Sequence, residues 1–338
     1  MRLYRCVLPP NAGHMDAVYD AACPAVANWV RRCLGGPGES ADWAVTGGGV
    51  RLARKNSSAD RSVREGGLTA ASATFVGGKS VNQDAVGRLV APGPGREAAV
   101  VCVADGVTSS PYSEFGAAVA VATGLRAGRD WAAAPSETPL PERLLAGLER
   151  CRAALRNVRS RIRTALEEMV ALAPPKDSPH AVEEAYRQLA LLDSGYGEAL
   201  STTLLVLAAN REAVAGTAIG NGGFYNVRDD RVAPIWWTSA EQPLEQYVGA
   251  DTLPDSVTYA FERPWEGAGR EIAGAATDGV GAFEGFEDIR LAARENVPLD
   301  RLLRKIQKRL RERGVDLDLL DNSSLAEIGG GRAEGGAR

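Results

Sequence analysis

Short apolar runs that begin near residue 68 give the chain its first structural pattern. Residues 68–76 and 97–104 are such runs, and 98–104 is apolar without interruption, which predicts a strand buried on both faces. Further runs of strand character occupy 202–209, 213–219, 224–228, 232–238, 272–277 and 323–328. Asp229 and Asp230 separate two of these runs, and this spacing predicts a hairpin.

Helical periodicity appears in two stretches between these runs. Apolar residues recur at steps of three and four, with arginines between them, at Leu144, Leu148, Cys151, Leu155, Val158, Ile162, Leu166 and Met169. A second amphipathic helix is predicted at Leu299, Leu302, Leu303, Ile306 and Leu310, ending at Gly314. Because strands come in runs and do not alternate regularly with helices, the pattern favours an α+β fold over a doubly wound parallel sheet.

Composition changes along the chain and divides it into three parts. Residues 1–66 are glycine-rich and charged apart from one helix predicted at 16–33, and they are predicted to form a partly helical N-terminal extension. Residues 67–328 carry the regular strands and helices and are predicted to form one domain. The glycine-rich residues 329–338 are predicted to form a disordered tail.

The overall charge and the apolar content exclude some classes of partner. Hydrophobic residues make up 45% of the 338 residues, charged residues 24%, and the net charge is −4. Nucleic acid is not the expected partner, because no basic excess is available to neutralise its phosphates. No apolar run approaches the roughly 20 residues that span a bilayer, and no secretory pattern begins the chain, so no membrane partner is expected.

The number and spacing of the five cysteines bear on the compartment of the protein. Cys6, Cys23, Cys33, Cys102 and Cys151 form no CxxC pair and show no regular spacing. This distribution suggests neither a disulfide framework nor a zinc ribbon. We therefore expect a soluble protein in a reducing cytoplasm.

Four aspartates share one kind of setting, at the end or edge of an apolar strand. They are Asp84 in NQD, Asp105 in VADG, Asp278 in ATDG and Asp321 in LLDN. Each alone is typical of a turn. Together, carboxylates converging at a sheet edge would repel one another unless hard cations neutralised them. With only His14 and His180 in the chain, an imidazole-built zinc or iron site is disfavoured, and magnesium or manganese fits better.

These aspartates belong to a series of motifs in a specific order. The series is GKSVNQD at 78–84, ADG at 104–106 with a helix start at Gly116, the STT of 201–203, IGNGGFY at 219–225, TDG at 277–279 and DNSS at 321–324. In this order the chain resembles the metal-dependent serine/threonine protein phosphatases of type 2C, in their bacterial form. The resemblance covers about residues 67–328.

The resemblance implies both a fold and a metal site. The fold is a four-layer α-β-β-α sandwich, in which two antiparallel sheets are flanked by helices. In the site, Asp105 would bridge two Mn²⁺ or Mg²⁺ ions, the carbonyl of Gly106 would bind one of them, and Asp84, Asp278 and Asp321 would complete the shell directly or through water.

Such a pair of ions implies direct hydrolysis of a phosphoester. Two cations acidify a bridging water, aim the resulting hydroxide at phosphorus and neutralise the phosphoryl oxygens. No covalent phosphoenzyme is required, and no cysteine is placed as a nucleophile. The substrate would be phosphoserine or phosphothreonine in a protein, phosphorylated by a cognate serine/threonine kinase.

Three positions depart from the family pattern. Lys79 stands five residues before Asp84, where the family has an arginine that holds phosphate, so Lys79 is assigned to phosphate binding and catalysis without the two-pronged geometry of guanidinium. Gln83 replaces an acidic residue of the outer metal shell. Asn221 replaces an aspartate and puts a third metal ion in doubt. The segment TSSPYSE at 108–114 is predicted to be a surface loop, or alternatively a rim that contacts the phosphoprotein.

Two other functions compete with this one. A catalytically weak phosphatase-like module would bind phosphoproteins or a kinase without hydrolysis. A metal-dependent hydrolase of nucleotides or small phosphoesters is the second alternative, although GGKS at 77–80 lacks the upstream glycine and following helix of a Walker loop. The helix at 16–33 either docks on the domain or serves to recruit a partner or cover the site.

Overall fold

The computed structural model describes most of the regular part of the chain. The described residues are 16–34, 46–47, 50–51, 68–75, 82–91, 98–172, 179–193, 198–228, 231–238, 246–265, 271–280, 289, 295, 297–314 and 323–330. Lys79 and Asp321, two of the predicted site residues, lie outside them. So do Cys6, His14 and the tip of the predicted hairpin at 229–230.

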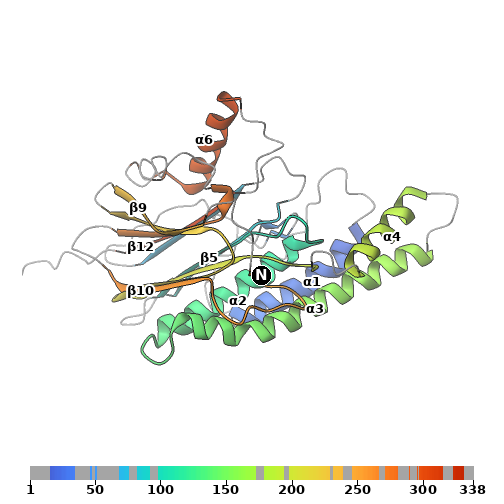
Figure 1. Cartoon of the computed structure of the whole chain (residues 1–338), viewed down its shortest axis with the longest axis horizontal. Coiled ribbons are helices and arrows are strands. Elements are labelled where there is room, and N and C mark those ends of the chain that lie inside the picture. Colours follow the sequence, from blue (N-terminus) through green and yellow to red (C-terminus); the bar gives the residue numbers. More distant parts are fainter. Residues whose placement is uncertain are drawn as a thin grey trace, which may run out of the picture.

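Two five-stranded antiparallel sheets form the centre of the molecule (Figure 1). The first has the order β10-β7-β6-β5-β4, with bounds Tyr259–Pro264, Ala213–Ile219, Leu204–Ala209, Ala98–Ala104 and Ala85–Ala91. The second has the order β3-β12-β11-β8-β9, with bounds Thr69–Phe75, Ser323–Gly330, Glu271–Ala276, Gly223–Arg228 and Arg231–Trp237. The short strands β1 (Thr46–Gly47) and β2 (Val50–Arg51) pair with each other.

The two sheets face each other across an apolar layer. Val101, Val103 and Leu205 of the first sheet share a buried cluster with Phe224 and Ile328 of the second. The opposite side chains of β5, such as Val100 and Cys102, belong to the core beneath the helices. Both faces of β5 are therefore buried, which explains its continuous apolar run.

Helices α2 (Ser113–Ala133) and α3 (Leu140–Leu172) lie on the outer face of the first sheet, and α1 (Asp16–Leu34) and α4 (Pro179–Asp193) pack on these helices (Figure 1). Helix α2 lies on β5 and β6, and its glycines allow the close approach, since a Cβ on Gly128 would lie 2.5 Å from a methyl of Val100. Helix α1 packs on α2 and α3, and the indole of Trp29 donates to the carbonyl of Val119 at 3.3 Å. No helix in these described ranges is both long and apolar enough to cross a membrane.

The outer face of the second sheet carries helix α6 (Leu299–Glu312), which packs against β3 and β12. Its apolar stripe, with Leu299, Leu302 and Ile306, is buried in a cluster with strand residues that include Ala73 and Leu325. Gly314 follows the helix with φ of 77°, the left-handed conformation that ends many helices. The layers are therefore helix, sheet, sheet, helix, and the α+β sandwich predicted from the sequence is confirmed.

Most predicted elements are present within two residues of their predicted bounds, but several described elements were not predicted, among them the two-residue strands β1 and β2. Strand β4 contains Gly87 and Arg88, which break the strand pattern, and the edge strand β10 ends in Glu262, Arg263 and Pro264. The full length of α2 was not predicted, because a helix rich in alanine and glycine and buried on nearly every side has no polar stripe. Helix α4 was not predicted either. Strand β12 reaches Gly330, two residues beyond the predicted end of the domain.

Candidate active site

Strand register brings Asp84, Asp105 and Asp278 to one edge of the sandwich. Asp84 directly precedes β4 and Asp105 directly follows β5, and these strands pair so that Ala85 faces Ala104. In the second sheet Ala276 of β11 faces Leu325 of β12, so Asp278 lies beside the start of β12. Antiparallel pairing therefore places residues that are far apart in sequence at the same strand ends.

Asp84 connects the two sheets. Its side chain is fully buried, and its Oδ2 accepts hydrogen bonds from the hydroxyls of Ser324 at 2.7 Å and Thr277 at 3.2 Å. Asp84 belongs to the β4 end of the first sheet, whereas both hydroxyls belong to the second. These two hydrogen bonds therefore join the carboxyl group of the first sheet to the second sheet. The neighbouring Asn82 donates to Thr74 at 2.8 Å and accepts from the Asp84 amide at 3.1 Å.

Asp278 has one oxygen satisfied and one available for a ligand. The side-chain amide of Asn221 donates to its Oδ2 at 2.6 Å. Its Oδ1 is buried, and no donor in the described part of the chain hydrogen bonds to it. The side-chain Oδ1 of Asn221 is also buried, and no donor in the described residues hydrogen bonds to it. Buried acceptors without donors are costly in an empty protein, so a cation bound there would offset that cost.

A tight turn brings Asn221 to Asp278. Gly222 has φ of 119°, and a Cβ on it would lie 2.7 Å from the carbonyl oxygen of Ala276. Glycine is required on both grounds, because other residues disfavour this φ and no space exists for a side chain. The turn between β7 and β8 thus lies directly against the end of β11.

Asp105 and Gly106 are fixed through their backbone. The amide of Asp105 donates to Thr203 Oγ1 at 3.0 Å, and the amide of Thr203 donates to the Asp105 carbonyl at 2.9 Å. Gly106 forms a bridge with Thr202, and a Cβ on it would lie 2.8 Å from the carbonyl oxygen of Gln83. The turn that carries Asp105 therefore packs tightly against the segment that carries Asp84.

Gln83 has a role that its sequence position did not reveal. Its side-chain amide donates to Ser113 Oγ at 2.9 Å, at the first residue of α2. An amide suits this contact, since it supplies a donor to a hydroxyl that faces the Asp105 turn.

The segment 108–114 is not the surface loop that the sequence predicted. Ser110, Tyr112 and Ser113 are buried, and α2 already begins at Ser113. The amide of Leu200 donates to the carbonyl of Pro111 at 3.0 Å, so the turn is paired with 198–203. Of this segment only Thr108 and Ser109 are exposed.

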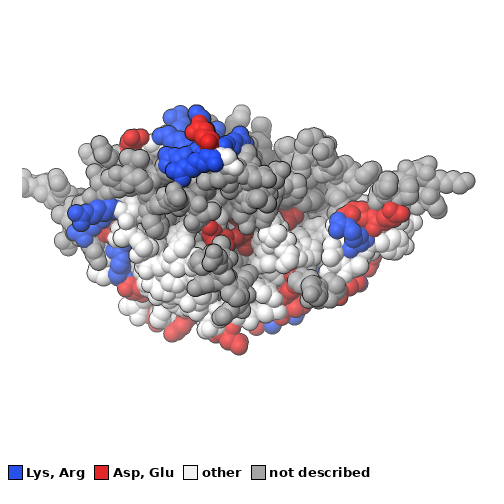
Figure 2. Space-filling view, turned by 45° about the horizontal axis from the view of Figure 1, so that its top comes forward, with Lys and Arg blue, Asp and Glu red and all other residues white. Residues whose placement is uncertain are grey.

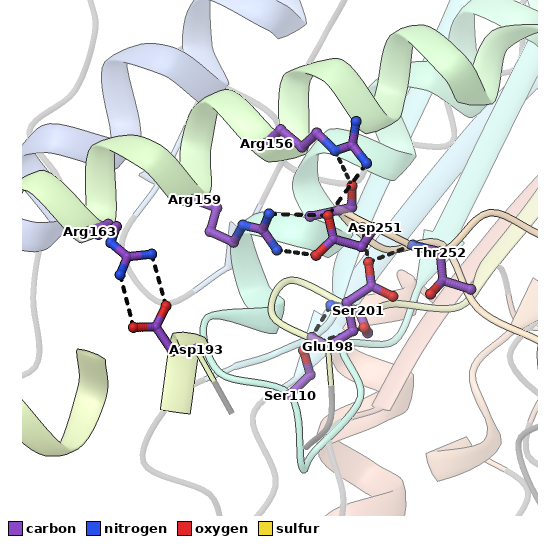
Figure 3. Close-up of polar contacts among 10 residues, drawn as sticks. Ser110, Arg156, Arg159, Arg163, Asp193, Glu198, Ser201, Asp251 and Thr252 are labelled. Carbon is purple, nitrogen blue, oxygen red and sulfur yellow. Dashed lines mark hydrogen bonds and ion pairs between the residues drawn. The ribbon is translucent and has the colours of Figure 1, made fainter. Parts of the chain in front are cut away.

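A polar network contacts the segment 198–203 (Figure 3). Ser110 Oγ donates to the carbonyl of Glu198 and accepts from the amide of Ser201. The Glu198 carboxylate accepts from the backbone amides of Asp251 and Thr252, the latter at 2.7 Å. Arg159 of α3 pairs with the Asp251 carboxylate and lowers the pKa of that group. The network links α3 to the segment that holds Asp105.

Three described cysteines are excluded as nucleophiles. Cys33, Cys102 and Cys151 are buried thiols that form no disulfide. Burial raises the pKa of Cys33 to about 11 and that of Cys151 to about 12, and it raises the pKa of Cys102 as well. A thiol reacts as its thiolate, so none of these three buried groups is activated at neutral pH.

A hard cation fits the chemistry of this edge. The side chains gathered there offer carboxylate, amide and hydroxyl oxygens, which suit Mg²⁺ and Mn²⁺. Within the described ranges no group of three or more His, Cys, Asp and Glu side chains is close enough to hold a metal ion by itself. A complete metal shell would therefore need backbone carbonyls, water or residues outside those ranges.

Comparison with known proteins places the chain in a family. The family model described as Protein phosphatase 2C matches residues 76–324. A search of curated proteins gave no match. Similar solved structures include a serine/threonine phosphatase of S. agalactiae, with 17% identity over 77% of this chain and 98% of that chain and a TM-score of 0.45. They also include PppA of Pseudomonas aeruginosa, with 18% identity, coverages of 78% and 97% and a TM-score of 0.42. PstP/Ppp of Mycobacterium tuberculosis gives 14% identity, coverages of 78% and 99% and a TM-score of 0.43.

Because the family match extends over most of its length, the chain belongs to the protein phosphatase 2C family. Its enzyme class is that of the protein serine/threonine phosphatases, and the family acts on phosphoproteins with a metal ion.

Proposed function

We propose that this chain hydrolyses phosphoserine and phosphothreonine in proteins with two Mn²⁺ or Mg²⁺ ions bound at the edge that carries Asp84, Asp105 and Asp278. The observation that carries the proposal is the buried Asp278 Oδ1, which lacks a donor in the described part of the chain. It lies on a carboxylate whose other oxygen is held at 2.6 Å by Asn221. An oxygen so oriented is suited to bind a cation.

Each described residue has a separate task in this proposal. Asp105 and Asp278 would supply carboxylate oxygens to the ions, and the carbonyl of Gly106 would supply a neutral one. Asp84 has Oδ2 committed to Ser324 and Thr277, so it acts mainly by fixing the two sheets and contributes negative charge. When bound, the ions would lower the pKa of a ligand water and neutralise charge on the phosphoryl group.

Lys79 and Asp321 complete the proposal from outside the described residues. Asp321 would be a further metal ligand, and its motif neighbour Ser324 supports this because it hydrogen bonds to Asp84 at 2.7 Å. Lys79 would hold a non-bridging oxygen of the phosphate with its ammonium group. The phosphatase domain at 67–328, the cognate kinase and the cytoplasmic location predicted from the sequence stay proposals.

Metal removal tests the proposal directly. After exhaustive chelation, hydrolysis of a phosphothreonine peptide and of para-nitrophenyl phosphate is expected to fall to background and to return with added Mn²⁺ or Mg²⁺. Undiminished turnover in the chelated protein would contradict it. No turnover under any metal, with intact phosphopeptide binding, would favour the phosphatase-like binding module. Faster hydrolysis of nucleotides than of phosphopeptides would favour the nucleotide hydrolase.

The Asn221 contact gives a prediction with a readout other than activity. Asn221→Asp would place a second carboxylate 2.6 Å from Asp278 Oδ2, where like charges repel in the absence of a cation. We expect a lower melting temperature in metal-free buffer and a larger upward shift on adding Mn²⁺ than in the parent protein, measured by differential scanning fluorimetry.

The matched control for this change is Asn226→Asp. Asn226 also donates its side-chain amide to a carboxylate, that of Glu271, at 3.4 Å. Asn226 itself lies in the middle of β8 and not at the strand ends that carry Asp84, Asp105 and Asp278. This variant is expected to lose stability without any larger Mn²⁺ response. Equal Mn²⁺ shifts in both variants and the parent would remove Asn221 from the metal region.

A further inference from the structure

Helix α6 carries a concentration of positive charge that the proposed catalytic site does not use. Seven lysines and arginines between 301 and 313 are exposed: Arg301, Arg304, Lys305, Lys308, Arg309, Arg311 and Arg313. Glu312 is the one exposed carboxylate in the same described stretch. In Figure 2 blue atoms dominate this helix at the top of the molecule, with a small red patch beside them. The chain as a whole has a net charge of −4, so this charge is local.

The cations form a stripe opposite the buried face. Arg301, Arg304, Lys308 and Arg311 follow one another at steps of three, four and three, which places them along one side of a helix. The buried Leu299, Leu302, Leu303 and Ile306 lie on the other side, against the second sheet. From Arg301 to Arg311 the stripe is about 15 Å long, at about 1.5 Å per residue. An extended peptide of about five residues covers that length.

The two ion pairs described for this region are exposed to solvent. Lys308 lies 3.7 Å from Glu312, and Lys305 lies 4.0 Å from Glu295. Both pairs join side chains that are more than half exposed, and exposed pairs of this kind contribute little. Both remain accessible to another anion.

We propose that the basic stripe of α6 is a docking site for an acidic segment of the phosphoprotein substrate. The proposal rests on the proposed function and narrows its substrate class to proteins with clustered Asp, Glu or additional phosphate groups away from the hydrolysed position. The position of α6 supports it, because the helix packs on β3 and β12, and the starting residues of β12 bind Asp84. A segment held on α6 therefore remains near the sheet whose strand ends form the site.

A membrane surface and a nucleic acid fit the same observations less well. Basic helices that enter a membrane surface present apolar side chains to it, but the apolar side chains of α6 whose burial is described are buried in the sandwich. A nucleic acid needs basic contacts along an extended footprint. On the face shown in Figure 2, the other described charged side chains include both signs. An acidic peptide about as long as the stripe would complement its positive charge without contacting any other surface of the protein.

Binding of unphosphorylated peptides tests the docking separately from catalysis. The probes are fluorescent decaglutamate and decaglutamine, with fluorescence anisotropy as the readout. The parent protein is expected to bind decaglutamate about tenfold more tightly than decaglutamine, and about 0.5 M NaCl is expected to abolish the difference. Changing Arg301, Lys308 and Arg311 together to Gln is expected to weaken decaglutamate binding about tenfold, the size expected of three exposed charge pairs.

The control removes the same charge elsewhere. Arg150, Arg161 and Arg187 are exposed on α3 and α4, and changing all three to Gln is expected to alter decaglutamate binding by less than about twofold. Equal losses in both triple variants, or no preference for decaglutamate in the parent, would overturn the proposal. Tighter binding of duplex DNA or of phosphatidylserine vesicles than of decaglutamate would also overturn the proposal, if the α6 variant loses that binding.

Turnover of two substrates relates the docking site to the reaction. The α6 variant is expected to keep the parent kcat/KM on para-nitrophenyl phosphate. It is expected to lose about tenfold in kcat/KM, through KM, on a phosphothreonine peptide joined by a glycine-serine linker to a glutamate tract. Unchanged kcat/KM on this peptide would overturn docking of the substrate. If the parent hydrolyses neither substrate, the proposed function fails, and the anisotropy result still decides whether α6 binds acidic segments.

Discussion

Asp278→Asn is expected to lower kcat/KM for a phosphothreonine peptide by about two to three orders of magnitude at low Mn²⁺ concentration. The change removes the negative charge from a carboxylate whose buried Oδ1 is assigned to a cation. The fold is expected to persist, since Asn has the same shape and its carbonyl oxygen still accepts the hydrogen bond from Asn221. Asp105→Asn is expected to lose activity by a similar factor, with the backbone bonds to Thr203 intact.

Asp255→Asn is the matched control, because Asp255 is an exposed carboxylate in the described segment 246–265. Its kinetics are expected to equal those of the parent. Circular dichroism and melting temperature measured on all three variants separate loss of metal binding from loss of fold. Parent-like rates in both site variants at low Mn²⁺ would remove Asp105 and Asp278 from the catalytic centre.

Gly116→Ala is expected to give the largest loss of stability, more than about 3 kcal/mol, with a poor yield of folded protein. A Cβ on Gly116 would lie 2.0 Å from the carbonyl oxygen of Leu200, which is backbone and has no rotamer to move. Leu200 itself has φ of 65°, so the segment that would have to move is already constrained. The same segment holds Asp105, and any folded fraction is expected to lose activity as well.

Gly147→Ala tests whether the loss at Gly116 comes from the close contact or from a general intolerance of helix changes. Gly147 is also a buried helical glycine, and a Cβ on it would meet one methyl group of Thr123 at 3.3 Å. Alanine favours a helix by up to about 1 kcal/mol over glycine, so this variant is expected to be within about 1 kcal/mol of the parent. Urea unfolding of both variants gives the comparison. A Gly116→Ala protein as stable as the parent would contradict the tight packing of α2 on Leu200.

The sequence predicted elements best where burial on one face leaves a regular pattern. The long stripe from Leu144 to Met169 predicted α3, and the stripe from Leu299 predicted α6. Helix α2 could not be recognised in the same way, because alanines and glycines packed between a sheet and two helices show no polar face. Strand β4 was not predicted, because Gly87 interrupts the strand pattern. The glycine makes room for Val121 and Leu125, a requirement that comes from α2 and not from the strand itself.

The candidate site also combines features that the sequence predicts with features that depend on the tertiary structure. Motif order predicted Asp84, Asp105 and Asp278 as site residues and correctly indicated the family. It did not show that Asp84 is held by hydroxyls from the other sheet, or that Gln83 donates to Ser113, because those contacts join positions up to 240 residues apart. The sequence determined which chemical groups are present and where strands end. The tertiary structure decided which oxygens are already satisfied and which remain for a ligand, because hydrogen bonding depends on distances that only the packing of two sheets establishes.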